Sequence, residues 1–160
     1  MELPLLGTWE CRIDDKRRLT LPARLRELLS SVDPSPELIV TRGDKGCLLI
    51  IPPKIWKEFS PDLFRAIVGG DEDAQRLRAT MAVYGNVSRI DNTGRITLTD
   101  KQVRVASLDK GAILLGNFNR VELWNSEQFA AEFPELGEPR GDDRLAARYL
   151  DGMATPKEKA

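Results

Sequence analysis

Short runs of apolar residues, separated by polar turns, recur along this chain and predict a strand-rich fold. The stretches Thr8–Ile13 and Leu19–Leu21 flank a polar segment, which is typical of a β-hairpin. Leu25, Leu28 and Leu29 then follow at the i, i+3, i+4 spacing of a helix that buries one face. The pattern predicts an α+β fold, mainly β, with short helices at the periphery of antiparallel strands.

The same pattern occurs twice along the chain. An offset of 77 residues aligns Asp14 with Asp91 and Arg18 with Arg95. A helix, a strand, a glycine-bearing turn, a strand and a short helix with an aromatic residue follow in each copy. These elements are expected at 23–29, 38–40, 43–46, 48–51 and around Trp56 in the first copy, and at 100–106, 113–115, 116–119, 121–124 and around Phe129 in the second. Self-similarity at a fixed offset indicates a duplicated structural unit.

A helical connector is expected between the copies. Ser60 and Pro61 are expected to begin one helix, and Asp71 or Asp73 to cap another. After Pro134 the chain becomes polar and charged. The predicted organisation is a first repeat at 5–59, a connector at 60–84, a second repeat at 85–133 and a polar C-terminal tail at 134–160.

Charge is distributed unevenly, although the formal net charge is only −1. Residues 12–26 carry six basic and two acidic side chains, a net charge of +4, and residues 89–104 carry four and two, a net charge of +2. The rest of the chain therefore sums to −7. A basic patch of this kind suits a polyanionic partner, but it also fits two solvated turns with ordinary surface charge.

Several classes of function are excluded or disfavoured by composition. The chain has no histidine, so neither a Ser-His-Asp or Cys-His arrangement nor a histidine-containing zinc site can form. Cys11 and Cys47 are too few for a four-cysteine site, and they lie in apolar runs where reduced core cysteines are expected. No glycine-rich phosphate loop, apolar run of about 18 residues or secretory leader is found. We therefore expect a cytoplasmic protein that is not an enzyme and has no cofactor, metal, membrane anchor or small-molecule substrate.

Two in-register Asp-x-x-x-Arg motifs inside duplicated units make the sequence similar to the MraZ family, within the wider AbrB-like group of bacterial transcription regulators. The motifs are Asp14–Arg18 and Asp91–Arg95, and the segments Leu48–Pro52 with Trp56 and Arg120–Trp124 complete the resemblance. Single Asp-x-x-x-Arg motifs are common, whereas two at the same place in a repeat are specific.

The resemblance covers roughly residues 5–133 and implies both a fold and a function. The implied fold is a swapped-hairpin β-barrel, formed here as an intramolecular pseudo-dimer of the two repeats. The implied partners are double-stranded DNA and further copies of the chain in a ring. The implied role is regulation of the division and cell-wall gene cluster, including its own operon, through repeated promoter boxes, with the protein on the nucleoid. Arg17 stands where the family usually has glycine, and Thr99 where proline is common.

The two motifs suggest how DNA would be bound. Guanidinium groups grip phosphates or guanine edges in a bidentate fork, so Arg18 and Arg95 are the expected DNA-contacting residues. Further phosphate contacts are expected from Lys16, Arg17 and Arg12. Supporting roles in the motifs are assigned to Asp14 and Asp91, which would hold each arginine or its turn, and to Gly94, which permits a tight turn.

Other interpretations stay open at this point. Each Asp–Arg pair could serve only to staple its turn. The whole molecule could be an oligomeric protein-interaction module, an antitoxin-like barrel whose arginines form interface salt bridges. Basic residues on the predicted helices are expected in subunit or intramolecular ion pairs rather than on DNA; these are Arg24, Arg26, Lys101 and Arg104.

Overall fold

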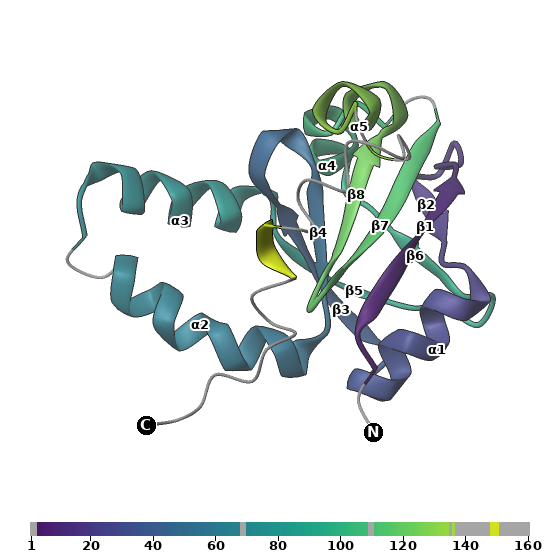
Figure 1. Ribbon diagram of the computed structural model, residues 1–160, viewed down its shortest axis with the longest axis horizontal. Coiled ribbons are helices and arrows are strands. Elements are labelled where there is room, and N and C mark those ends of the chain that lie inside the picture. The colour runs from purple at the N-terminus through teal and green to yellow at the C-terminus, as the bar shows by residue number, and fades with distance from the viewer. Residues whose placement is uncertain (1–2, 68–69, 109–110, 135, 137–147, 151–160) are drawn as a thin grey trace. The chain divides into compact units, whose positions relative to one another are not determined.

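The computed structural model describes residues 3–67, 70–108, 111–134, 136 and 148–150, and the chain divides into two compact units, Met1–Ser126 and Glu127–Ala160. Strands and helices follow one another in the order seen in Figure 1: β1 Leu5–Cys11, β2 Arg18–Thr20, α1 Ala23–Val32, β3 Glu37–Arg42, a 3-10 turn Asp44–Gly46, β4 Leu48–Ile51, α2 Pro53–Ile67, α3 Glu72–Tyr84, β5 Asn86–Arg89, β6 Arg95–Thr97, α4 Asp100–Val105, β7 Ala112–Phe118, β8 Val121–Asn125 and α5 Ser126–Glu132. Most of the predicted tail lies outside the described residues.

The strands of the first unit form one six-stranded antiparallel sheet and one separate two-stranded ribbon. The order in the sheet is β1-β7-β8-β4-β3-β5, and the ribbon pairs β2 with β6. The first strand of each copy pairs with the other copy, because β1 lies against β7 and β5 lies against β3. Two further strand pairings between the copies join β4 to β8 and β2 to β6. The sheet order is unchanged when the copies are exchanged, so the two repeats complete each other.

The sheet is open, so the expectation of a closed β-barrel is wrong. The predicted α+β class with a dominant antiparallel sheet is confirmed. Strands β1 and β5 are the two edges, and no ladder among the described residues joins them. Closure would need strands that continue from one edge to the other. The strands that follow β1 and β5 across their turns are β2 and β6, and these pair with each other instead.

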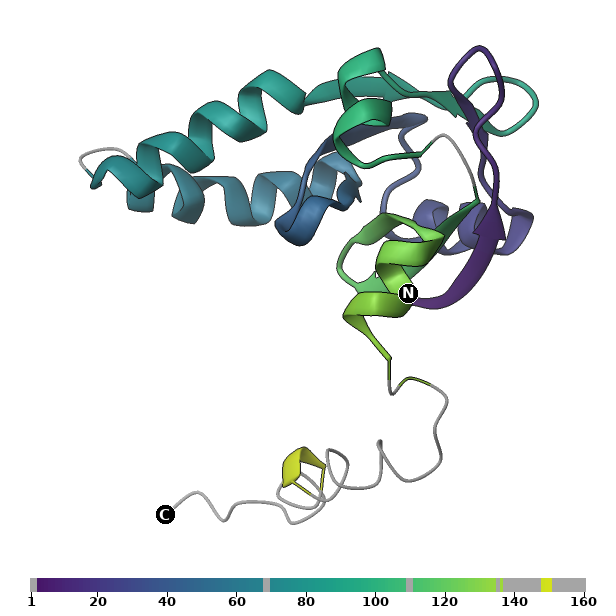
Figure 2. The same ribbon diagram turned by 90° about the horizontal axis from the view of Figure 1, so that it is seen from above.

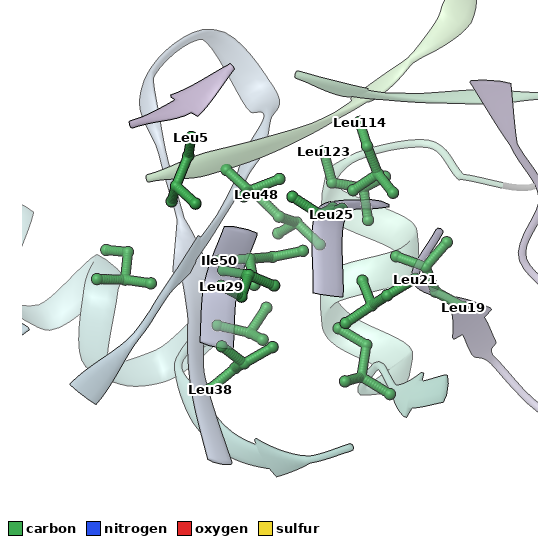
Figure 3. Packing of buried hydrophobic residues seen from close by; sticks show 14 of the residues in the cluster. Leu5, Leu19, Leu21, Leu25, Leu29, Leu38, Leu48, Ile50, Leu114 and Leu123 are labelled. Carbon is green, nitrogen blue, oxygen red and sulfur yellow. The ribbon is translucent and has the colours of Figure 1, made fainter. Parts of the chain in front are cut away.

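One hydrophobic core serves both copies. Leu19 of β2 and Ile96 of β6 are fully buried, so the ribbon turns one face inward. Figure 3 shows Leu25 of α1 among Leu114 and Leu123 of the sheet, with Leu19 nearby. Burying a leucine contributes about 1.5–3 kcal/mol. This packing fixes the ribbon, and with it the two turns that flank it.

Helices α2 and α3 differ in part from the prediction. Helix α2 runs continuously through Ser60 and Pro61, where a new helix was expected to begin. A proline inside a helix loses its own backbone hydrogen bond and its ring crowds the carbonyl four residues earlier, at a cost of about 3 kcal/mol, which is why a helix start was expected there. The predicted cap of α3 is confirmed, because the carboxylate of Asp71 accepts a hydrogen bond from Ala74 N at 3.0 Å. Figures 1 and 2 both show α2 and α3 side by side, projecting from the sheet.

Candidate nucleic-acid interface

The turn between β1 and β2 is a three-residue hairpin loop stapled by one carboxylate. Asp14 N donates to Arg18 O at 3.0 Å, and Arg17 N donates to Asp14 O at 3.0 Å. Asp14 Oδ1 accepts from the backbone nitrogens of Lys16 and Arg18, at 2.9 and 2.8 Å. Its Oδ2 accepts from Arg18 Nε at 2.7 Å. One aspartate therefore closes the loop and orients the arginine.

The turn between β5 and β6 repeats this construction. Asp91 N donates to Arg95 O at 2.8 Å, and Gly94 N donates to Asp91 O at 3.0 Å. Asp91 Oδ1 accepts from the backbone nitrogens of Thr93 and Arg95, both at 2.9 Å, and Oδ2 accepts from Arg95 Nε at 2.9 Å. The spacing Asp-x-x-x-Arg is thus the spacing of a stapled hairpin loop in both copies, and the second turn adds a hydrogen bond from Thr93 Oγ1 to Asp91 Oδ1 at 2.9 Å.

Both aspartates are held in the ionised form. The Arg18 backbone N–H lowers the pKa of Asp14, and the Arg95 backbone N–H holds the pKa of Asp91 far below its usual range. Each carboxylate is therefore negative at neutral pH and neutralises the arginine of its own motif. Net positive charge at the turns must come from other residues.

The third loop residue adopts a left-handed backbone in both turns. Its φ is 60° at Arg17 and 80° at Gly94. Glycine adopts this conformation without steric cost, whereas other residues are strained there. Arg17 therefore keeps the turn geometry of a glycine while adding a side chain to the loop.

The ribbon presents both motif arginines on the same outward face. Arg18 lies opposite Thr97, and Arg95 lies opposite Thr20. Since side chains alternate along a strand, these four residues face away from the core while Leu19 and its partner face inward. Strand geometry then separates the two arginine Cα atoms by about 8 Å. Figures 1 and 2 show both turns at the end of the unit away from α2 and α3.

The motif arginines keep donors available for a ligand. The side chains of Arg18 and Arg95 are 29% and 30% exposed, so they are neither buried nor fully solvated. Their Nε atoms are bound to the motif aspartates. In the described parts of the chain, their terminal nitrogens Nη1 and Nη2 have no protein partner. Each arginine therefore presents two terminal nitrogens as hydrogen-bond donors, and the motif aspartate holds its guanidinium in place beside the turn.

The other predicted contacts also lie around the turns. Arg12, Lys16 and Arg17 are exposed. Ile13 bridges to Leu19 and packs on the core, so strand alternation places Arg12 on the outward side, like the motif arginine.

The basic residues on the helices behave differently from one another. Arg24 pairs with Glu27 at 3.0 Å, and Arg104 pairs with Asp100 at 3.0 Å, as expected. Arg26 forms no ion pair within the described residues, and its pairing with another subunit stays a prediction. Its Nε donates to the backbone carbonyl of Leu21 at 3.1 Å. Sequence analysis missed this residue because nothing in its local pattern indicates that contact.

The described residues offer no other obvious reactive site. They contain no cluster of three acidic or cysteine side chains that could hold a metal, and none of their helices is long and apolar enough to cross a bilayer. The two cysteines are free, and burial raises the pKa of Cys11 to about 11 and that of Cys47 to about 12.

Comparison with known proteins finds relatives that match this chain over most of its length. The family model described as "MraZ protein, putative antitoxin-like" matches residues 5–75. A Transcriptional regulator MraZ from Corynebacterium kroppenstedtii is 34% identical over 147 residues, which are 90% of this chain and 98% of that protein. Proteins of the same name from Neisseria meningitidis and Thermomicrobium roseum are 31% and 32% identical, each over 79% of this chain and over 83% and 85% of their own lengths. This chain therefore belongs to the MraZ family.

Proposed function

We propose that this chain is a transcription regulator that binds double-stranded DNA with the outward face of the β2–β6 ribbon and its two flanking turns. The name of its relatives, Transcriptional regulator MraZ, supports the regulatory role. The observation that carries the DNA-binding role is the pair of motif arginines, which share one face with their terminal nitrogens unoccupied.

The dimensions of the ribbon suit the DNA major groove. That groove is about 12 Å wide and admits a two-stranded β-ribbon. Neighbouring strands lie about 4.8 Å apart, so a pair of strands with its side chains fits within this width. Arg18 and Arg95 then reach guanine edges or phosphates with two donors each. Lys16, Arg17 and Arg12 add phosphate contacts, which strengthen binding without reading sequence.

The remaining features of the proposal are those that resemblance to the family suggests. The targets are repeated promoter boxes, including those of the protein's own operon in the division and cell-wall cluster. Several chains assemble into a ring. The DNA-binding sites of the ring are then linked to one another and gain affinity through effective concentration. The pairing of the first strand of each copy with the other copy supports a swapped-hairpin arrangement. The protein works in the cytoplasm on the nucleoid, without cofactor or catalysis.

The test is DNA affinity of the motif variants Arg18→Ala and Arg95→Ala, measured by fluorescence anisotropy on the upstream region of the gene. Loss of a bidentate contact costs about 1–3 kcal/mol, so affinity is expected to fall about 5- to 150-fold. Arg104→Ala is the matched control, because it makes the same charge change in an exposed ion pair on α4. Equal affinity for all three variants would refute the assignment.

The salt dependence of binding gives a second test. Each phosphate neutralised contributes about −0.9 to the slope of log K against log salt. With several basic residues around the turns, affinity is expected to fall steeply between low and moderate salt. A flat response would mean that the basic residues make few phosphate contacts.

The alternative is an oligomeric protein-interaction module, and the antitoxin-like description of the matching family model favours it. In that case the arginines would pair with carboxylates of a partner protein. Selection from random duplex DNA separates the two functions. A DNA regulator enriches a repeated sequence, whereas an interaction module enriches nothing.

A further inference from the structure

The two turns differ at all three loop positions, and the difference at the third is compensated from elsewhere in the chain. The 77-residue offset aligns Arg17 with Gly94, so the second turn lacks a side chain that the first turn has. The same offset aligns Arg26 of α1 with Val103 of α4. Both arginines of this kind therefore come from the first copy, and the second copy has glycine and valine at the aligned positions.

The backbones of the two turns make equivalent contacts with the opposite strand of the ribbon. Leu98 N donates to Arg17 O at 2.8 Å, and Leu21 N donates to Gly94 O at 2.9 Å. These two leucines are themselves equivalent in the repeat. The carbonyl groups of Leu21 and Leu98 consequently occupy matching places beside the two turns.

Two different arginines donate to these matching carbonyls. Arg17 Nε donates to Leu98 O at 3.2 Å, and Arg26 Nε donates to Leu21 O at 3.1 Å. A Cβ atom added at Gly94 would lie 2.8 Å from Cζ and Nη1 of Arg26 and 2.9 Å from its Nε. The guanidinium of Arg26 thus fills the space that a side chain at Gly94 would need, and it covers that buried glycine.

The charge of these two arginines is not neutralised by a carboxylate. A carbonyl is a neutral acceptor, and within the described residues neither Arg17 nor Arg26 makes an ion pair. The motif arginines, by contrast, are each paired with an aspartate. Arg17 and Arg26 therefore supply uncompensated positive charge at corresponding places beside the two turns, with Nη1 and Nη2 unoccupied.

We infer that Arg26 is the counterpart of Arg17 at the second turn, and that the two guanidinium groups bind DNA phosphates on either side of the motif arginines. This inference rests on the proposed function. It gives each half of the ribbon one base-reading and one phosphate-binding arginine, although the sequence places both phosphate-binding arginines in the first copy.

The test begins with Arg26→Gln. Glutamine keeps an N–H donor for the Leu21 carbonyl but carries no charge, so the melting temperature is expected to stay near that of the parent while DNA affinity falls. The slope of log K against log salt should become shallower by about 0.9, the value for one phosphate contact. Arg24→Gln is the matched control, because Arg24 lies on the same helix and is already paired with Glu27.

A charge transplant gives the second arm of the test. Arg26→Val copies the residue of α4 onto α1 and is expected to weaken DNA binding. Adding Gly94→Arg in the same chain recreates the arrangement of the first turn, so the double variant should regain affinity and salt slope. A purely structural role for Arg26 would not be rescued in this way, because the lost affinity would then follow the loss of stability.

The outcomes for the inference and for the proposed function are distinguishable. If Arg26→Gln binds DNA as tightly and with the same salt slope as Arg24→Gln, while Arg18→Ala is impaired, the role of Arg26 is refuted and DNA binding by the motifs stands. If Arg18→Ala also binds normally, the proposed function itself fails.

Discussion

Gln102 connects several elements of the fold, and its replacement is expected to destabilise the molecule strongly. The side chain is fully buried. Its Oε1 accepts from Thr99 N at 2.9 Å, and its Nε2 donates to Tyr84 O and to Asn86 Oδ1, both at 2.8 Å. A longer contact of 3.4 Å reaches Val40 O. This one amide joins the start of α4 to the end of α3, to β5 and to β3.

The size of the effect follows from these bonds. Gln102→Ala removes three short hydrogen bonds, each worth about 1 kcal/mol net, and leaves buried acceptors without donors, which costs more. We expect a loss of about 3–5 kcal/mol, or a fall of about 10–20 °C in the melting temperature. Thr99→Ala removes only the helix cap and should cost about 1 kcal/mol.

Gln102→Glu is the sharper variant, because it keeps the shape of the side chain. Its second oxygen would face the oxygens of Tyr84 and Asn86, and burial would raise the pKa of the new carboxyl. The variant should therefore be least stable at neutral pH and move toward the parent as pH falls and the carboxyl becomes protonated. Urea unfolding at pH 5 and pH 8 measures this. The reasoning is refuted if Gln102→Ala lies within 1 kcal/mol of Thr99→Ala, or if Gln102→Glu is as stable as the parent at pH 8.

Three further predictions concern Asp91, the two cysteines and Gly116. The pKa of Asp91 is lowered in the fold, so its ionised carboxylate contributes fully to stability above its ordinary pKa of 3.8 and loses this contribution as pH falls below that value. The difference in unfolding free energy between the parent and Asp91→Asn, measured in urea, should therefore shrink as pH falls below 3.8. Cys11 and Cys47 have raised pKa values and should react slowly with a thiol reagent at pH 7 in the native state and rapidly in urea; fast native labelling would contradict their burial. Gly116→Ala would place a Cβ atom 2.9 Å from the backbone of β1 and should destabilise the fold by about 1–3 kcal/mol. The loss should exceed that of Gly46→Ala, where nothing lies within 4 Å of the added atom and only the left-handed φ opposes the change. Thermal unfolding of the two variants ranks their stabilities.

Local sequence patterns were sufficient for much of the fold. The strand Leu48–Ile51 and the capping box of Thr99 with Gln102 were predicted as observed, because β-propensity and helix caps depend on neighbouring residues. The repeat was found because its motif has a fixed local geometry. The pairing of strands between the copies was harder to predict from the sequence, since a pairing such as Leu5 with Phe118 depends on the packing of the whole core.

The candidate site was predicted only in part. The two motifs were identified because a stapled hairpin leaves an Asp-x-x-x-Arg spacing in the sequence. Arg26 was expected in a subunit or intramolecular ion pair, as is common for basic residues on exposed helices, but no acidic residue lies three or four positions away from it on α1. Its contact with the second turn spans 68 positions from Gly94 and leaves no local pattern.

The joining of both repeats in one polypeptide has a consequence for how this protein can evolve. In a homodimer of single repeats, a two-fold axis forces every substitution to appear at both ends of the ribbon. Here one end holds Arg17 and the other Gly94, so the symmetry is broken at the turn itself. Under the proposed function, a fused chain can therefore match each end to a different DNA half-site, and the DNA site that it binds need not be a palindrome.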